Sequence, residues 1–387
     1  MVKQLERTSL EVGIPISCIG VTQSNDVVFG GGGGPGRSGV QNKLAVYRID
    51  DKNELVKANE LVLSSDEDAP TCLAIHPKEN ALVCSVNASK EQIKKGENNN
   101  CRLYALDKDS SVKPGNTAMT ICSSTDMDYQ RCIAFSPSGK LIAGGATNGT
   151  LAVVENPSLC RAFPYVEATD EINDVDFNES SAWLVAATDA ELKVLSTKDG
   201  SLVKSIEDPH TSSGARAVFR FARFGRGKGT LRTGSQVKRS SLLYTVLNTR
   251  SRKGAYIVQW DTDKWTRTAT RFAAHSPITT FALSYNGELL AFATASLQIA
   301  ICDAHSLKVL MRIKDAHTFA ITALAFDKEN RRLISGSADE SCRVFVLPDT
   351  WPTPADIAVA FAKDHIQIIA MVLALLIAIV AAFSMRG

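Results

Sequence analysis

The residues with the most unusual chemical potential lie in segment 29–47, FGGGGGPGRSGVQNKLAVY. Five consecutive glycines, followed by Gly36 and Gly39, carry no Cβ atom, so this backbone can adopt positive φ angles and approach an ion or another surface closely. Ordering such a backbone costs much conformational entropy, which a bound ligand or partner would have to offset. Three interpretations follow: a phosphate cradle, a flexible linker or an ordered binding loop.

The phosphate cradle is suggested by Gly31 and Gly36 followed by Arg37 and Ser38, which nearly match the P-loop pattern. An overlapping glycine pattern is similar to a dinucleotide-binding turn. A P-loop needs a lysine that reaches the phosphates and a helix that begins immediately after the loop. Here an arginine replaces the lysine, and residues 44–49 alternate like a strand. The sequence therefore disfavours both kinds of phosphate site.

The other two interpretations depend on what flanks the glycines. Glycine-rich runs are usually mobile, which favours a linker. Strand-like residues lie on both sides, however, with 25–29 entering the segment and Leu44 and Val46 leaving it, so the glycines are predicted at a hairpin tip. We therefore favour an ordered loop, in which backbone carbonyls turn inward to hold a cation while Asn42 and its neighbours project outward.

The elements that must position this loop repeat along the chain. Segments 135–155 and 283–303 align without a gap, and the same cadence returns at 326–346, at 177–196 and from residue 75. Each unit is typical of a strand, a polar turn, a small-residue strand, a tight turn and a third strand. The N-terminal unit and the diverged segment 216–265 bring the number to about seven, at the spacing of WD40 blades. The predicted fold class is an all-β, seven-bladed WD40-like propeller over residues 1–350.

Histidines near the blade boundaries are expected to be structural. The dipeptide Trp260-Asp261 preserves the WD40 signature, whereas Ala-His replaces the usual Gly-His at His275 and His317. In such blades the histidine and an aspartate at the tight turn, here Asp339, hydrogen bond between strands. The sequence shows no convincing nucleophile, base and carboxylate arrangement, so we do not expect an enzyme that makes or breaks bonds.

Composition bounds the remaining possibilities. A net charge of +2 with 22% charged residues disfavours a protein that binds polyanions through its bulk charge. The 9 cysteines are an odd number, scattered singly and without a C-x-x-C pair. This pattern is typical of reduced, packed thiols in a reducing compartment, and it does not predict a metal site.

The C-terminal end predicts a membrane anchor. Residues 366–385, IQIIAMVLALLIAIVAAFSM, contain one Gln and no charge, and their length suits a hydrocarbon core of about 30 Å. We expect a transmembrane helix from Ile366 to Met385, a juxtamembrane linker over 351–365 and a lumenal tail of 386–387. A buried docking helix is the alternative, disfavoured because the segment is apolar on every face. Since the N-terminal residues have charges where a signal peptide is apolar, we expect the propeller to face the cytosol.

A basic segment runs from Arg216 to Lys253, with eleven Lys or Arg residues and no acidic residue. A solvated insertion in the fifth blade is the simplest interpretation. Contact with anionic lipid beside a membrane anchor explains the same residues. Phenylalanines and a glycine-rich run among the charges also allow nucleic-acid binding, through a DNA-binding regulator, but we expect no nucleic-acid partner.

These pieces together resemble one family, the ER-membrane guanine-nucleotide exchange factors for the Sar-type small GTPase, or Sec-twelve and prolactin regulatory element-binding family. The most specific pieces are residues 31–44, GGGGPGRSGVQNKL, and residues 316–322, AHTFAIT. The resemblance spans nearly the whole chain. It implies an exchange factor that catalyses GDP release at the ER membrane and so initiates COPII vesicle coat assembly, without bond chemistry.

The resemblance also implies roles for single residues. It implies that the loop over 30–42 is ordered around a potassium ion, which neutral carbonyls can hold, and that Asn42 is central to exchange. The candidate carbonyl ligands are those of Gly34, Gly36, Gly39 and Val40. The residues expected to contact the GTPase are Val40, Gln41, Asn42, Lys43 and Leu44. The alternative function is a membrane-tethered WD40 scaffold without exchange activity.

Overall fold

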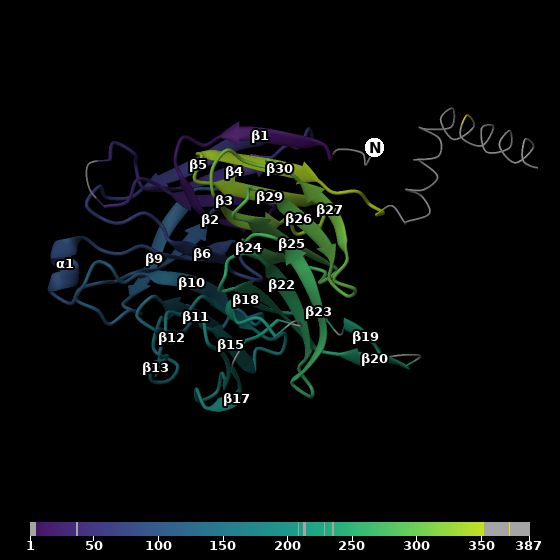
Figure 1. Ribbon diagram of the computed structural model, residues 1–387. Coiled ribbons are helices and arrows are strands. Elements are labelled where there is room, and N and C mark those ends of the chain that lie inside the picture. The colour runs from purple at the N-terminus through teal and green to yellow at the C-terminus, as the bar shows by residue number, and fades with distance from the viewer. Residues whose placement is uncertain are drawn as a thin grey trace, which may run out of the picture. The chain divides into compact units, whose positions relative to one another are not determined.

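Short runs of β-branched and small residues, separated by polar turns, fold here into antiparallel strands (Figure 1). The computed structural model describes residues 5–35, 38–207, 209–211, 214–227, 229–233, 236–351 and 371, and over 228–240 it describes no side chains. Residues Arg7–Val346 form one compact unit. Within it, the described strands make seven four-stranded sheets and one separate hairpin.

The first four blades follow one another along the chain. Blade one contains β2 (Ile16–Val21), β3 (Val27–Gly31), β4 (Lys43–Ile49) and β5 (Leu55–Val62). Blade two contains β6 (Cys72–Ile75), β7 (Ala81–Ser85), β8 (Cys101–Leu106) and β9 (Val112–Ala118), with helix α1 (Lys90–Lys94) between β7 and β8. Blade three contains β10 (Gln130–Phe135), β11 (Leu141–Ala146), β12 (Thr150–Glu155) and β13 (Val166–Glu167). Blade four contains β14 (Asp174–Phe177), β15 (Trp183–Ala187), β16 (Glu191–Ser196) and β17 (Leu202–Glu207).

The last three blades include an insertion and the closing strand. Blade five contains β18 (Ala217–Phe224), β21 (Leu242–Thr249), β22 (Ala255–Asp261) and β23 (Thr266–Ala274), with the hairpin of β19 (Gly229–Thr233) and β20 (Gln236–Ser240) between β18 and β21. Blade six contains β24 (Ile278–Leu283), β25 (Leu289–Thr294), β26 (Ile299–Asp303) and β27 (Val309–Ile313). Blade seven contains β28 (Ile321–Phe326), β29 (Arg332–Ser337), β30 (Ser341–Val346) and the N-terminal strand β1 (Arg7–Glu11).

Pairing of β1 with β30 closes the ring. The register runs from Arg7 opposite Phe345 to Glu11 opposite Ser341, and Val12 N–H then donates to the Glu340 carbonyl at 2.8 Å. The predicted seven-bladed, all-β propeller is confirmed. The predicted transmembrane helix, 366–385, lies outside the described residues apart from Met371, as does most of the predicted linker. In the described part of the chain, no helix is both long and apolar enough to cross a membrane.

The core lies between neighbouring blades. Strands such as β3 and β25 are buried along their whole length, because both of their faces pack against another blade. Small residues are needed there: a Cβ atom on Gly145 would lie 2.4 Å from the Ile172 side chain of the next blade. This explains the small-residue strand in each repeat. Seven of the nine cysteines are buried in these layers, as expected, whereas Cys122 and Cys160 are exposed.

The blades expose two different ends of the propeller. In each blade the strands alternate in direction, so the turns after the first and third strands lie at one end, and the loops after the second and fourth lie at the other. The first turns hydrogen bond to one another around the ring: Ser138 N–H donates to Ser181 Oγ at 3.0 Å, and Lys328 N–H donates to Asn25 Oδ1 at 3.2 Å. We call this end the first-turn face and the opposite end the glycine-loop face.

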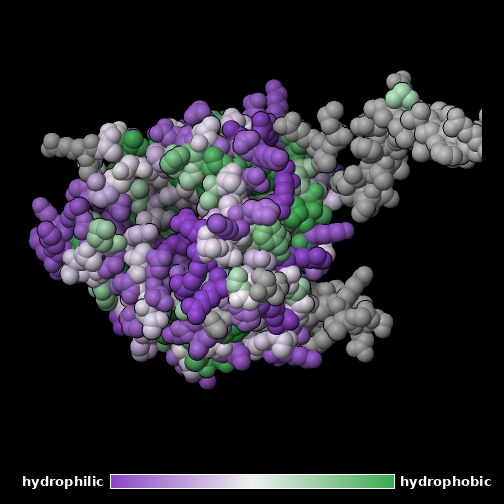
Figure 2. Space-filling view, in the orientation of Figure 1, coloured by the Kyte–Doolittle hydropathy of each residue, from purple (hydrophilic) through white to green (hydrophobic). Residues whose placement is uncertain are grey.

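Figure 1 shows both faces from the side, with α1 and the β3–β4 loop on the left and the β19–β20 hairpin on the right. Strand β30 is the third strand of its blade and therefore ends on the first-turn face. The side surface is largely hydrophilic, with small separate apolar patches (Figure 2).

Candidate functional site

The glycine-rich loop joins β3 to β4 at the tip of a hairpin. Gly31 pairs with Lys43 at its base, which confirms the hairpin predicted from the flanking residues. Strand β4 begins immediately after the loop, where a phosphate-binding loop would have a helix. The structure thus agrees with the rejection of a P-loop.

The glycines are required by close contacts as well as by backbone angles. A Cβ atom on Gly31 would lie 2.0 Å from the Pro15 carbonyl oxygen, and one on Gly33 would lie 1.9 Å from Ser38 Oγ. Gly32 has φ +146°, and its Cβ would lie 2.3 Å from Asn42 Oδ1. Gly34 and Gly39 have φ values near +80°. The loop is folded tightly on itself, which argues for an ordered loop and against a linker.

Asn42 holds this fold from the inside. Its Oδ1 accepts a hydrogen bond from Gly34 N–H at 3.0 Å, and its Nδ2 donates to the Gly34 carbonyl at 3.0 Å and to the Glu67 carbonyl at 2.9 Å. Only 3% of the residue is exposed. The expectation that Asn42 projects outward is therefore wrong in this structure, because its carboxamide is used within the loop and on the connector at Glu67.

The connector after blade one extends this arrangement into blade two. The Glu67 carboxylate accepts two hydrogen bonds from the Arg102 guanidinium, at 2.8 and 3.1 Å. Burial lowers the pKa of Arg102, but the hydrogen bond and charge of Glu67 outweigh it, so that the pKa is raised. Neither residue was predicted from the sequence, where the only signal is the acidic run of residues 66–68.

The other residues predicted to contact a partner occupy different environments. Gln41 is exposed, and Val40 packs partly against the core between blades seven and one. Lys43 Nζ lies 3.2 Å from the Glu60 carboxylate. Leu44 is fully buried between blades one and two and cannot reach a partner, so its expected contact role is wrong. The exposed loop residues are Gly33, Pro35, Ser38, Gly39 and Gln41.

Donors for a weakly hydrated cation are present in part of the loop. Of the four candidate carbonyls, that of Gly34 also accepts from Asn42 Nδ2, that of Val40 lies 3.5 Å from Ser38 Oγ, and that of Gly36 is outside the described residues. Asp68 lies beside Gly34, and burial raises its carboxyl pKa. Neutral carbonyls with one nearby carboxylate suit potassium. The described residues contain no cluster of three or more His, Cys, Asp or Glu that could hold a metal.

The chain is similar to one repeat family and to several named proteins. The model of the WD domain, G-beta repeat, matches residues 120–154 and 308–345. The chain is 28% identical over 325 residues to SEC12-like protein 2 of Arabidopsis thaliana, covering 82% of this chain and 75% of that protein. It is 23% identical over 344 residues to the guanine nucleotide-exchange factor SEC12 of Candida glabrata, covering 87% and 72%. It is 26% identical over 246 residues to the Rattus norvegicus protein of the same name, covering 58% and 56%.

The resemblance to the Sec-twelve family is confirmed. It rests on relatives with modest identity that nevertheless align with most of the propeller. The name shared by two of these relatives describes nucleotide exchange, which requires contact with a GTPase but no bond chemistry in the exchange factor.

The two histidines have different environments. His317 is buried, with Nε2 2.7 Å from Ser335 Oγ and Nδ1 3.0 Å from Ser341 Oγ and 3.2 Å from Asp339. Its expected structural role is confirmed. His275 is exposed and packs against the Phe272 ring, so the expected interstrand network is wrong there.

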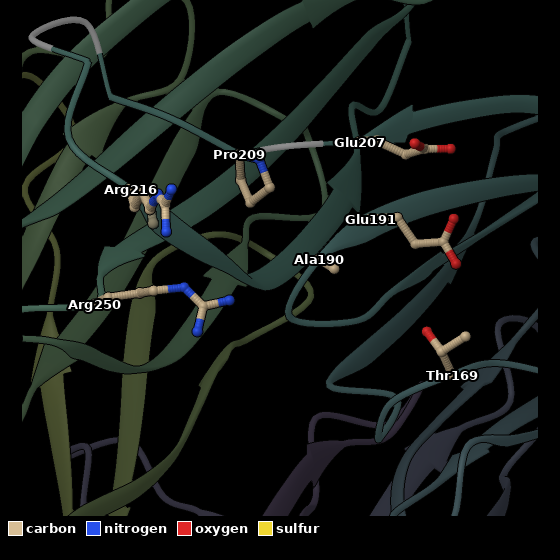
Figure 3. Close-up of a pocket in the computed structure, with 8 residues that line it drawn as sticks. Thr169, Ala190, Glu191, Glu207, Pro209, Arg216 and Arg250 are labelled. Carbon is tan, nitrogen blue, oxygen red and sulfur yellow. The ribbon is translucent and has the colours of Figure 1, made fainter.

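The basic segment is divided between the two faces. Arg216 and Arg250 lie on the glycine-loop face and line one side of a cavity of about 550 Å³ between blades four and five, with Glu191 and Glu207 on the other side (Figure 3). Arg223 lies on the inner strand of blade five, where it is paired with Asp174. The β19–β20 hairpin is on the first-turn face. The segment interpreted as one insertion in the fifth blade is therefore several separate features.

Proposed function

We propose that this protein is a guanine-nucleotide exchange factor that catalyses GDP release from a Sar-type small GTPase at the ER membrane, which initiates COPII coat assembly. The observation that carries the proposal is the glycine-rich loop that Asn42 holds in one shape, in a chain whose relatives are named as exchange factors. The loop would contact the GTPase through its exposed residues.

The mechanism is differential binding. An exchange factor that binds the nucleotide-free GTPase more tightly than the nucleotide-bound form must, by thermodynamic reciprocity, weaken nucleotide binding by the same factor. A loop that is already ordered loses little conformational entropy when it binds. In this mechanism Asn42 is a positioning residue: it holds Gly34 and the connector at Glu67, while Gln41 and Ser38 provide polar contacts.

Potassium fits the same arrangement as a proposed cofactor. The carbonyls of Gly34, Gly36, Gly39 and Val40 would hold it, and the bound ion would offset the repulsion between carbonyl dipoles that converge in a tight loop. Asp68 would add one negative charge nearby. The loop would then be more ordered in potassium than in sodium.

The first-turn face is the proposed membrane side. Strand β30 ends there, and the chain continues toward the predicted anchor over 366–385, which would place the protein in the ER membrane with its propeller in the cytosol. The β19–β20 hairpin is on the same face, and the chain around it, 226–239, carries basic residues. Contact with anionic lipid is proposed for this part of the basic segment only.

The test is release of fluorescent GDP from a purified Sar-type GTPase, with the full chain in detergent and with potassium or sodium as the only monovalent cation. Asn42→Ala is the test variant, and Asn248→Ala is a matched control. Asn248 lies in blade five and makes an analogous clamp, with Oδ1 accepting from Ile278 N–H at 2.9 Å and Nδ2 donating to its carbonyl at 3.0 Å.

We expect acceleration by the wild-type chain and by Asn248→Ala, and loss of it in Asn42→Ala. A folded wild-type chain that leaves GDP release unchanged in potassium would contradict exchange activity. The propeller would then act as a membrane-tethered scaffold, and loop variants would leave its partner binding intact.

A further inference from the structure

The central channel of the propeller opens on the first-turn face into a cavity of about 540 Å³. Residues from all seven blades line it, most of them apolar. Its charged residues come from blades four, five and seven: Asp176, Glu179, Arg223, Arg226 and Lys328. These charges are not used by the glycine-rich loop, which lies on the opposite face.

The positive charge of Arg223 is already balanced by a carboxylate. Its guanidinium donates to the buried Asp174 carboxylate, which also accepts from Ala222 N–H at 2.9 Å. Arg226 has a weaker partner, because its guanidinium lies 3.9 Å from Asp176, whose carboxylate also accepts from Phe224 N–H at 2.8 Å. Arg226 therefore retains donors that can bind a further anion.

The positive charge of Lys328 is balanced even less. Its ammonium lies 3.8 Å from the centre of the Tyr285 ring, and it has no carboxylate within ion-pair distance among the side chains that the structure describes. Burial and the charge of Arg226 lower the pKa of Lys328 to about 8. Glu179, the remaining acidic residue of the cavity, is exposed. The mouth of the cavity, which is its opening on the first-turn face, thus combines two cations, Arg226 and Lys328, with one closely placed carboxylate, that of Asp176.

The turns that carry these cations are fixed. Gly287, with φ +73°, packs so closely on the backbone of Arg226 that a Cβ atom would lie 2.8 Å from the Arg226 carbonyl oxygen. Lys328 N–H donates to Asn25 Oδ1 in blade one. Both cations therefore lie against the β24–β25 turn, Arg226 at Gly287 and Lys328 at Tyr285, and the cost of placing two positive charges there is one that an anionic ligand would recover.

We propose that this mouth is a binding site for a phosphate monoester, with Arg226 and Lys328 as the two charged ligands and Tyr285 as the adjoining wall. An arginine fork and an ammonium group together match the charge of a phosphate monoester near neutral pH. The chain continues from Arg226 toward the β19–β20 hairpin, which is on the same face. The ester is either a soluble phosphate or the headgroup of a phospholipid.

The experiment uses the full chain in a neutral detergent and two families of probe. Inositol hexakisphosphate and inositol monophosphate test a soluble ester, and a short-chain phosphatidylinositol monophosphate, compared with short-chain phosphatidylinositol, tests a headgroup. Calorimetric titration measures affinity. Lys328→Gln and Arg226→Gln remove one ligand each, and Lys140→Gln is the matched control, because Lys140 is exposed in the first turn of blade three.

We expect Lys328→Gln and Arg226→Gln each to weaken binding by about tenfold or more, the effect of losing one charge-assisted contact, and Lys140→Gln to weaken it little. GDP release should be unchanged in all three, since the glycine-rich loop is on the other face. Binding of the soluble probes identifies a free ester, and binding of the lipid monophosphate alone identifies a headgroup.

A second measurement avoids dependence on the folding of the variants. In wild-type protein labelled at lysine, the Lys328 pKa should rise when the probe saturates the site, because an anion favours the ammonium form. The proposal fails if no probe binds, if Lys140→Gln loses as much affinity as Lys328→Gln, or if saturation leaves the Lys328 pKa unchanged.

Discussion

Replacement of Asn42 by alanine tests whether this residue shapes the loop or touches the partner. The change removes three hydrogen bonds, to Gly34 N–H and to the carbonyls of Gly34 and Glu67. At about 1 kcal/mol net for each, the loop should open more easily by about 3 kcal/mol, which is about a hundredfold in the opening equilibrium. The propeller core should be unaffected.

Hydrogen–deuterium exchange of the Gly34 amide measures this opening directly. We expect its protection to fall about a hundredfold in Asn42→Ala, together with loss of nucleotide exchange. In Asn248→Ala, protection should fall at the Ile278 amide instead, and nucleotide exchange should persist. Asn42→Asp should behave like Asn42→Ala near neutral pH, because a carboxylate can accept from Gly34 N–H but is repelled by the two carbonyls.

The refuting result is specific. If Asn42→Ala abolishes nucleotide exchange while the Gly34 amide keeps its protection, Asn42 acts by direct contact with the GTPase, and the buried orientation is not the one that matters. Retention of full exchange activity in Asn42→Asp would equally contradict a role in holding the loop.

Two further predictions concern the loop and the closing blade. Gly32→Ala should destabilise the loop by about 2 kcal/mol or more and abolish nucleotide exchange, since its Cβ would meet Asn42 Oδ1. The control is Gly96→Ala, which should retain activity because Gly96 has φ +79° but nothing lies within 4 Å of the added Cβ. Equal loss of activity in both variants would make backbone strain alone the cause. Burial lowers the pKa of His317 despite Asp339, so the unfolded chain binds the proton more tightly and the free energy of unfolding should fall as pH drops below about 6.5. Urea unfolding at about pH 7.5 and 5.5 should show this fall, and His317→Asn should reduce it; an unchanged fall would assign it to other groups.

The propeller could be predicted because its signals are local. Each repeat carries its own strands and turns, so segments such as 135–155 and 283–303 identify blades without knowledge of their neighbours. Helix α1 was missed, although Ser89 and Gln92 form a capping box that a search for helix starts could have found. Closure of the ring by β1 could not be predicted, because an alternating strand pattern at the N-terminus does not indicate which strand it pairs with.

The details of the loop depended on contacts between distant residues. The partners of Asn42 lie 8 and 25 positions away, so sequence order gives no indication that the carboxamide turns inward. Leu44 alternates as a strand residue should, but which face of β4 meets blade two is decided by packing. The basic segment appeared continuous because its charges adjoin in sequence, whereas antiparallel strands carry them to opposite ends of blade five.

The pairing of β1 with β30 has a consequence for how the protein is made. During synthesis β1 leaves the ribosome before the other strands of the propeller and its partner β30 leaves after them, so blades one to six can form from local contacts while β1 remains an unpaired edge. An incomplete chain would therefore display an open strand that chaperones and proteases can recognise. Only a chain that has reached Val346 can pair this strand along its whole length, so the last step of translating the propeller is also the step that closes it.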